Sequence, residues 1–389
     1  MGSDSEVNSL RLLLRSIGSP LRRWLRASLF LFVFLYAGVV CAAESLPERL
    51  SDEDFWKLIQ QSSEPAQPFP GENYVSNEVR YPAAVRALKE NRIVDGVYLG
   101  VGPEQNFTYI SVTRSKLAFI IDIRRQNMLE HLMYKALFEM AEDRADFLSR
   151  LFGRKRPEGL SSGSTAKQLM DAFMDASRSP DAADDTLKAI LKTLHETHGF
   201  SLSAADDANI EKVFKVFAAS GPQTNYNSGG ANPNAPSVFY AALMTSADVD
   251  GNVWSYLATE GTYQWLRTMQ RANLIVPIVG DFGGPKAIRA VGDFLRNYDA
   301  TVSVFYLSNV ETYLFAGSGS GGPTAAVRDI SPNGGWQAFF ENVSTLPLDE
   351  SSRFIRFQGA GGAPQVVSIR KNLDGVRSGA IKSLADLFK

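Results

Sequence analysis

The chain has 389 residues, of which 44% are hydrophobic and 21% charged, and this ordinary globular composition excludes a disordered chain and permits one large or two modest domains. Its 40 Lys and Arg against 42 Asp and Glu give a net charge of -2, so we expect no nucleic-acid partner. The single cysteine, Cys41, lies in an N-terminal apolar segment, which excludes a disulfide framework and a cysteine-based zinc site from the rest of the chain.

Residues 1–43 have the pattern of a secretory signal peptide. A basic stretch ending at Arg26 precedes an apolar run over residues 27–40, and small residues follow at Ala42 and Ala43. The run is shorter than the roughly 20 apolar residues of a bilayer-spanning helix. We therefore expect cleavage and export, to the periplasm or outside the cell. The alternative is a retained segment that tethers the protein to the inner membrane.

Residues 44–95 are expected to form an N-terminal helical cap. Acidic residues after Ser51 favour a capped helix start, the proline-rich stretch 64–71 ends that helix, and a second helix is expected over 79–90. Asn77 and Glu78 lie in this segment, and they could fold over the ligand cleft expected at the ends of the strands that follow.

Apolar strands and amphipathic helices alternate in the next part of the chain. Strands are expected at 96–99, 117–121, 274–279 and 301–307, and helices at 127–152 and 285–295. Two short segments, 353–357 and 366–369, offer further strands. The alternation predicts an α/β fold with a doubly wound, mostly parallel, Rossmann-type sheet, formed by residues 96–152 and 274–389.

A large insertion, residues 153–273, follows the second strand and its helix. It contains several amphipathic segments and a polar loop rich in Asn, Gly and Pro over 221–236. We expect a helical insertion that folds beside the sheet, and such insertions often cover ligand sites.

A glycine turn, Gly100-Val101-Gly102, follows the first buried strand, and Asp122 ends the second. Glycines at such a turn let the backbone approach a cofactor, and an acid about 20 residues further on can bind ribose hydroxyls. The alternative is a tight strand-to-helix turn and an aspartate that merely ends a strand.

This order of elements resembles the class I S-adenosylmethionine-dependent methyltransferase superfamily. The resemblance covers residues 95–315 without the insertion, and it implies that Gly100, Gly102, Asp122, Gly280 and Asp281 bind S-adenosylmethionine. Tyr98 stands at the family's usual acidic position and Glu104 at its third glycine. The stretches 98–110, 276–289 and 304–314 also resemble an uncharacterised group of bacterial proteins.

The end of the fourth expected strand carries Ser308, Asn309 and Glu311, a hydroxyl, an amide and a carboxylate where ligands bind in open α/β sheets. We expect a polar substrate there, and the alternative is a helix cap. For Asp281 the alternative to ligand binding is an acid that stabilises a helix N-terminus, where the helix dipole favours negative charge.

Other candidate groups have simpler explanations. Arg124 and Arg125 could bind a carboxylate or phosphate, but a solvated charge cluster is the alternative. His195 and His198 lack a third ligand, and His131 fits a helix interior, so no metal is expected.

Three functions follow from these patterns. The first is an exported enzyme that uses S-adenosylmethionine to methylate a small-molecule acceptor. The second is a non-catalytic module that binds a small molecule or a partner on a degenerate methyltransferase fold, which Tyr98 and Glu104 favour. The third is an NAD-type oxidoreductase, although Gln105 replaces the third glycine of that motif.

Overall fold

The computed structural model describes residues 45–69, 71–228, 238–316, 335–359 and 362–389. From Ser45 onward they form one compact unit. The predicted targeting segment, residues 1–43, lies outside the described residues. Within the ranges described, no helix combines the length and the apolar character needed to cross a membrane.

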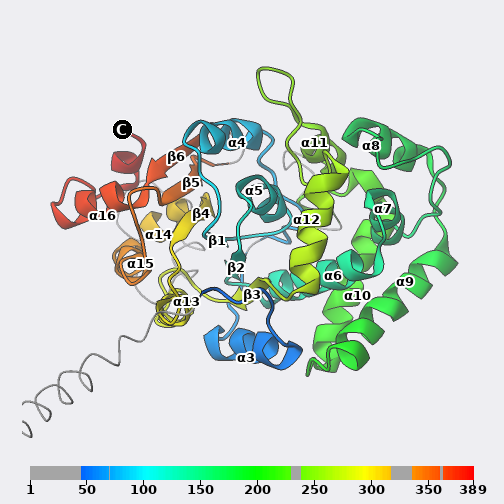
Figure 1. Cartoon of the computed structure of the whole chain (residues 1–389), viewed down its shortest axis with the longest axis horizontal. Coiled ribbons are helices and arrows are strands. Elements are labelled where there is room, and N and C mark those ends of the chain that lie inside the picture. The colour runs from blue at the N-terminus through cyan, green and yellow to red at the C-terminus, as the bar shows by residue number, and fades with distance from the viewer. Residues whose placement is uncertain (1–44, 70, 229–237, 317–334, 360–361) are drawn as a thin grey trace, which may run out of the picture. The chain divides into compact units, whose positions relative to one another are not determined.

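A six-stranded sheet runs through the molecule in the order β3-β2-β1-β4-β5-β6 (Figure 1). Neighbouring strands from β3 to β5 are parallel, and β6 is antiparallel to β5. The sheet confirms the predicted α/β class with mostly parallel strands. Its strands are β1 (Val97–Gly100), β2 (Leu117–Asp122), β3 (Ile275–Val279), β4 (Val302–Ser308), β5 (Arg353–Phe357) and β6 (Pro364–Ser368).

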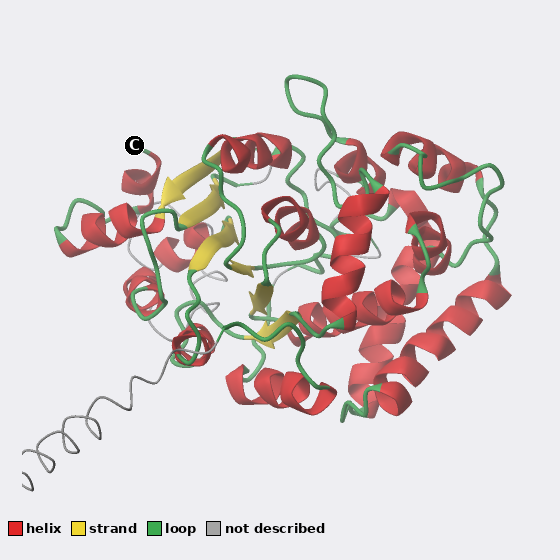
Figure 2. Ribbon diagram, in the orientation of Figure 1, coloured by secondary structure: helices red, strands yellow, loops and turns green. Residues whose placement is uncertain are grey.

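Helices cover both faces of the sheet, as the ribbon in Figure 2 also shows. In Figure 1, α5, α6 and α12 lie on one side of the sheet and α13, α14 and α15 on the other. The helices outside the β2–β3 connection are α3 (Asp52–Ser62), α4 (Tyr81–Glu90), α5 (Gln105–Thr113), α13 (Ala287–Arg296), α14 (Val310–Phe315), α15 (Gly335–Val343), α16 (Ile369–Arg377) and the 3-10 turn η5 (Leu384–Phe388).

Every regular element described between β2 and β3 is helical, and those from α8 to α12 lie within residues 153–273. These elements are α6 (Arg125–Met140), α7 (Arg144–Leu151), α8 (Ala166–Asp175), α9 (Pro180–Lys192), the π-helical turn η1 (Thr193–Thr197), α10 (Ala204–Ser220), the 3-10 turn η2 (Gly221–Gln223), α11 (Tyr240–Thr245) and α12 (Glu260–Arg271).

The single helix expected over residues 127–152 is instead two helices, α6 and α7. Ala141 has extended backbone, and the side chain of Asp143 accepts a hydrogen bond from the backbone N–H of Asp146. Because an aspartate N-cap begins a new helix, it outweighs the continuous apolar spacing of the sequence.

Aromatic side chains fasten α5 to α6 and to the insertion. The ring of Phe107 in α5 makes edge contacts with Tyr134 and Phe138 of α6 and with Tyr256, at centroid distances of 5.3 to 5.4 Å. All four side chains are fully buried. The packing holds the helix that follows the first glycine turn against the insertion, and so fixes the position of that turn.

Candidate ligand-binding site

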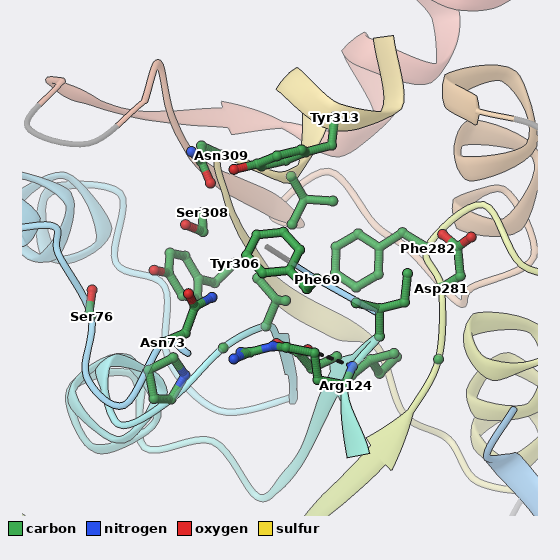
Figure 3. Close-up of a pocket in the computed structure, with 18 of the residues that line it drawn as sticks. Phe69, Asn73, Ser76, Arg124, Asp281, Phe282, Tyr306, Ser308, Asn309 and Tyr313 are labelled. Carbon is green, nitrogen blue, oxygen red and sulfur yellow. Dashed lines mark hydrogen bonds and ion pairs between the residues drawn. The ribbon is translucent and has the colours of Figure 1, made fainter. Parts of the chain in front are cut away.

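A cavity of about 280 Å³ opens at the carboxyl ends of β1, β2, β3 and β4 (Figure 3). Its volume is near the lower end of ligand pockets, about 300 to 1,000 Å³. The space lies beside the point where the strand order reverses, between β1 and β4. Its walls combine aromatic rings with amides, hydroxyls and charged groups: Phe69, Asn73, Ser76, Asn77, Val101, Gly102, Pro103, Ile121, Asp122, Ile123, Arg124, Tyr226, Gly280, Asp281, Phe282, Tyr306, Ser308, Asn309, Val310, Tyr313 and Leu314.

The cavity brings together most of the residues that the sequence singled out. Its lining includes Gly102, Asp122, Gly280, Asp281, Ser308 and Asn309. They come from the ends of four different strands, because parallel strands present their carboxyl ends at one edge of a sheet.

Gly100 does not line this cavity. A Cβ atom there would lie 2.0 Å from Oδ1 of Asn106 and 2.7 Å from the ring of Tyr98. The Tyr98 hydroxyl donates to Asn106 Oδ1 at 2.9 Å. The missing side chain at Gly100 therefore makes room for a buried tyrosine and asparagine of the protein itself.

Gly102, by contrast, faces open space. Its φ is +77°, and a Cβ atom there would meet no atom within 4 Å. Its carbonyl oxygen accepts hydrogen bonds from Asn106 Nδ2 at 3.0 Å and from His131 Nε2 at 2.9 Å. Because a carbonyl only accepts, His131 carries its proton on Nε2, and burial lowers its pKa to about 4, so it is neutral. The hydrogen bonds from Asn106 and His131 thus fix the position of this turn.

Asp122 is bound by the arginine two residues further on. Its Oδ1 accepts from the backbone N–H and Nε of Arg124, at 2.9 and 3.0 Å, and its Oδ2 accepts from Nη2 at 3.1 Å. A carboxylate offers about four lone-pair positions. One position on Oδ2 therefore remains for a hydroxyl group in the cavity.

Arg125 turns away from Asp122 and binds the insertion. Its Nε and Nη2 donate to the two carboxylate oxygens of Asp206, at 2.5 and 2.9 Å. This pair ties α6 to α10, so the exposed Arg125 is ion-paired and is not part of the cavity wall.

The second glycine-rich turn, residues 280–286, holds a carboxylate of the N-terminal segment. Oε1 of Glu64 accepts from the backbone N–H groups of Lys286 and Ala287, at 2.7 and 2.8 Å, and Oε2 accepts from that of Asp281 at 3.2 Å. A Cβ at Gly284 would lie 2.2 Å from Glu64 Oε2. Glu64 therefore occupies the anion position at the N-terminus of α13.

A second carboxyl group, that of Glu104, lies at the N-terminus of α5. It is completely buried, and its two oxygens accept from the backbone N–H of Ser76 at 3.1 and 3.2 Å. Burial raises the pKa of Glu104 to about 8. An acidic group at this position disfavours a phosphate where Rossmann-type proteins bind pyrophosphate.

Ser308 and Tyr306, at the end of β4, both bind Glu78. The Tyr306 hydroxyl donates to Glu78 Oε2 at 2.6 Å, and the Ser308 hydroxyl donates to Oε1 at 2.5 Å. Burial raises the pKa of Glu78 to about 7, although both hydrogen bonds lower it. The N-terminal segment therefore reaches the cleft with Ser76, Asn77 and Glu78.

Asn309 lines the cavity, whereas Glu311 points away from it. Glu311 is 2% exposed, and its Oε2 lies 3.0 Å from Nε of the fully buried Arg356 in β5. The pair joins α14 to β5. The structure thus separates Glu311 from Ser308 and Asn309, which lie three and two residues before it in the sequence.

Aromatic side chains from distant segments form part of the cavity wall. The rings of Phe69 and Tyr313 meet edge to face at 5.4 Å, and the guanidinium of Arg124 lies 5.6 Å from the Phe69 ring (Figure 3). Tyr226, from the loop after η2, also contributes to the wall. The insertion therefore contributes to the site, as expected.

The histidines of the insertion contact carboxylates. His195 Nε2 lies 2.8 Å from Asp207, and His198 lies between Asp52 and Glu139 at 2.8 and 2.7 Å. Throughout the described part of the chain, no three His, Cys, Asp or Glu side chains are placed to hold a metal ion.

Sequence reasoning missed the aromatic part of the wall and the role of Glu78. Phe69 and Tyr226 lie in irregular segments whose course no periodicity predicts. Tyr306 lies among apolar residues in a buried strand, and nothing in that pattern distinguishes it as a cavity residue. The polar run Ser76-Asn77-Glu78 was a usable signal, because such residues before a helix rarely become buried without partners.

The fold and the cavity define an α/β protein with a ligand-sized site at the carboxyl ends of its parallel strands. Residues 74–370 match a family described as a domain of unknown function (DUF7790), and the chain belongs to this family. No curated protein matches the chain significantly.

Proposed function

We propose that the chain binds S-adenosylmethionine in the cavity and transfers its methyl group to an acceptor that enters beside Ser308 and Asn309. The observation that carries this proposal is the meeting of Gly102, Asp122, Asp281 and Ser308 around one cavity. The strand order β3-β2-β1-β4-β5-β6 supports a Rossmann-type sheet, in which ligands bind at the point of reversal.

The chemistry of the wall favours a nucleoside without phosphates. Glu64 fills the N-terminus of α13, so that helix does not offer its free N–H groups to a pyrophosphate, and Glu104 places a buried carboxyl group at the N-terminus of α5. The adenosyl group of S-adenosylmethionine carries no phosphate, and its sulfonium is positively charged. Aromatic faces such as those of Phe282 and Tyr313 favour both an adenine ring and a cation.

Calorimetric titration of the purified chain with S-adenosylmethionine tests the proposal. We expect saturable binding, and no binding of NADH. Absence of heat with S-adenosylmethionine at millimolar concentration contradicts the proposal, whereas binding of NADH favours the dinucleotide alternative.

Gly102 and Gly251 provide a matched pair of variants. Both have positive φ, +77° and +81°, and neither would place a Cβ within 4 Å of another atom. Valine at either position imposes the same backbone strain, but only Gly102 lines the cavity. Gly102→Val is expected to weaken binding at least about tenfold, roughly 1.4 kcal/mol, and Gly251→Val to leave it unchanged.

One observation favours a second function, a non-catalytic binding module. Asp122 already accepts three hydrogen bonds from Arg124, which leaves it less able to bind both hydroxyls of a ribose. Mass spectrometry of small molecules released from the freshly purified protein distinguishes the two. A retained compound other than an adenosyl sulfonium or thioether supports the binding module.

A further inference from the structure

The carboxyl group of Glu78 lies directly beneath the cavity wall. Its side chain is 2% exposed, and its two oxygens accept one hydrogen bond each, from Ser308 and from Tyr306. Ser308 and Tyr306 both line the cavity, whereas Glu78 does not. A ligand can therefore reach this carboxylate only through a hydroxyl group of the wall.

Ser308 is held in an unusual conformation at this point. Its φ is +51°, in the left-handed region that non-glycine residues seldom adopt. Strained backbone of this kind persists where the surroundings enforce it, and it clusters at functional sites. Ser308 is the last residue of β4 and lines the cavity (Figure 3), and its hydroxyl donates to Glu78.

The groups that face Glu78 are acids and phenols. Tyr306 of β4, Tyr98 of β1, Tyr109 of α5 and Glu104 before α5 all interact with its charge. Among the groups that act on Glu78 in the described structure there is no cation. With respect to the described residues, this carboxylate is therefore neutralised by taking up a proton.

We propose that Ser308 and Glu78 form a proton relay for a hydroxyl group of the methyl acceptor. The acceptor hydroxyl donates to Ser308 Oγ, while Ser308 donates to Glu78 Oε1. The inference rests on the proposed function for the identity of the methyl donor, but the relay itself is tested separately.

The step balances in atoms and charge. The acceptor oxygen forms a bond to the methyl carbon as the carbon–sulfur bond breaks, and the electron pair of that bond stays on sulfur. The acceptor proton passes to Ser308, and the serine proton passes to Glu78. The sulfonium becomes a neutral thioether, and the carboxylate becomes a neutral acid, as general-base assistance requires.

The wall indicates which acceptors fit. A carboxylate acceptor needs no base and is repelled by Glu78, and a protonated amine has no lone pair for the reaction. The rings of Phe69 and Tyr226 favour an aromatic body. The relay therefore points to a phenol or a similar aromatic alcohol.

Phenol and its methyl ether, anisole, are matched probes for calorimetry with the purified full chain. Ionised Glu78 holds the serine proton and leaves Ser308 Oγ free to accept from phenol. Burial raises the pKa of Glu78 to about 7, so phenol affinity is expected to rise about fivefold between about pH 5.5 and 8.5, as for a charge-assisted hydrogen bond. Anisole donates no hydrogen bond, and its affinity is expected to stay constant.

Variants identify the side chains responsible for the pH dependence of phenol affinity. Glu78→Gln and Ser308→Ala are expected to abolish the rise of phenol affinity with pH, and anisole affinity is expected to stay independent of pH in both variants. Ser303→Ala is the matched control on the same strand, because that hydroxyl donates to Asp95 O at the opposite end. The rise is expected to persist in Glu104→Gln, since Glu104 binds the backbone of Ser76 rather than a hydroxyl of the wall.

The outcomes for relay and methyl donor are distinguishable. Absence of phenol binding, equal pH profiles for phenol and anisole in the unaltered protein, or an undiminished rise in a folded Glu78→Gln variant overturns the relay. If phenol affinity rises with pH in a Glu78-dependent way but S-adenosylmethionine does not bind, Glu78 is supported as the proton acceptor and the proposed methyl donor is contradicted.

Discussion

The two glycine-rich turns of this protein look alike in sequence and differ in use. Each follows a buried parallel strand and leads into a helix, at 100–102 after β1 and at 280–284 after β3. The first presents Gly102 to the cavity with open space in front of it, whereas the second encloses the carboxylate of Glu64. A glycine turn in the sequence therefore indicates only that some group approaches the backbone closely. It does not indicate whether that group is a ligand or another part of the chain.

The turns also differ in where their carboxyl groups come from. At the first turn Glu104 belongs to the turn itself and binds the N-terminal cap at Ser76. At the second turn the carboxylate belongs to the cap and binds the turn. Both contacts fasten the segment before β1 over the carboxyl edge of the sheet, which is how Ser76 and Asn77 come to line the cavity.

The largest effect is expected from Gly100→Ala in the first turn. The added methyl group displaces Asn106, which donates to the carbonyls of Val101, Gly102 and Pro103. Loss of these buried hydrogen bonds is expected to lower the free energy of unfolding by about 3 kcal/mol, measured by denaturant titration.

A double-mutant cycle gives the control for this prediction. Asn106→Ala removes the clashing side chain, so Gly100→Ala is expected to cost much less in that background. If Gly100→Ala lowers the free energy of unfolding equally in both backgrounds, the Asn106 side chain is not the reason that position 100 requires glycine.

The next effect concerns pH and Glu104. Its pKa in the folded protein, about 8, lies above the ordinary value of 4.5. The buried acid therefore contributes stability that is fully present below about pH 4.5 and is lost as pH rises through about 8. Glu104→Gln is expected to reduce the loss of unfolding free energy between about pH 5 and 9, by on the order of 2 kcal/mol.

Urea titrations at three pH values across this range measure the difference. Part of the slope is expected to remain, because burial raises the pKa of Glu78 and of Glu311 in the same direction. If the unfolding free energy of Glu104→Gln falls with pH as steeply as that of the unaltered protein, Glu104 is not held as a buried acid.

The smallest effect is expected at Glu64 in the second turn. Glu64→Ala removes the acceptor of three backbone N–H groups, and loss of such a helix cap typically costs about 1 kcal/mol. Glu64→Gln keeps one acceptor oxygen and is expected to cost less.

Added sulfate sharpens the comparison between the turns. An emptied turn at the N-terminus of α13 is a ready anion site, so sulfate is expected to raise the melting temperature of Glu64→Ala more than that of the unaltered protein. Equal shifts contradict the view that Glu64 occupies an anion position.

The sequence by itself determined the sheet and the place of the cavity. Strands buried on both faces are continuous apolar runs, so β1 to β5 were predicted within one residue at either end. Parallel strands bring their carboxyl ends together, and for that reason Gly102, Asp122, Gly280, Asp281, Ser308 and Asn309 could be expected near one another.

Only the tertiary structure decided what each of these groups contacts. Asn106 fills the space at Gly100, Arg124 binds Asp122, Glu64 fills the second turn and Arg356 draws Glu311 away. The partners at the second turn and at Glu311 lie far away in sequence, and no local spacing encodes such contacts. Glu78 reaches Ser308 in the same way, 230 residues along the chain. Local periodicity reports which backbone is buried, whereas the pairing of buried polar groups follows from how distant segments pack.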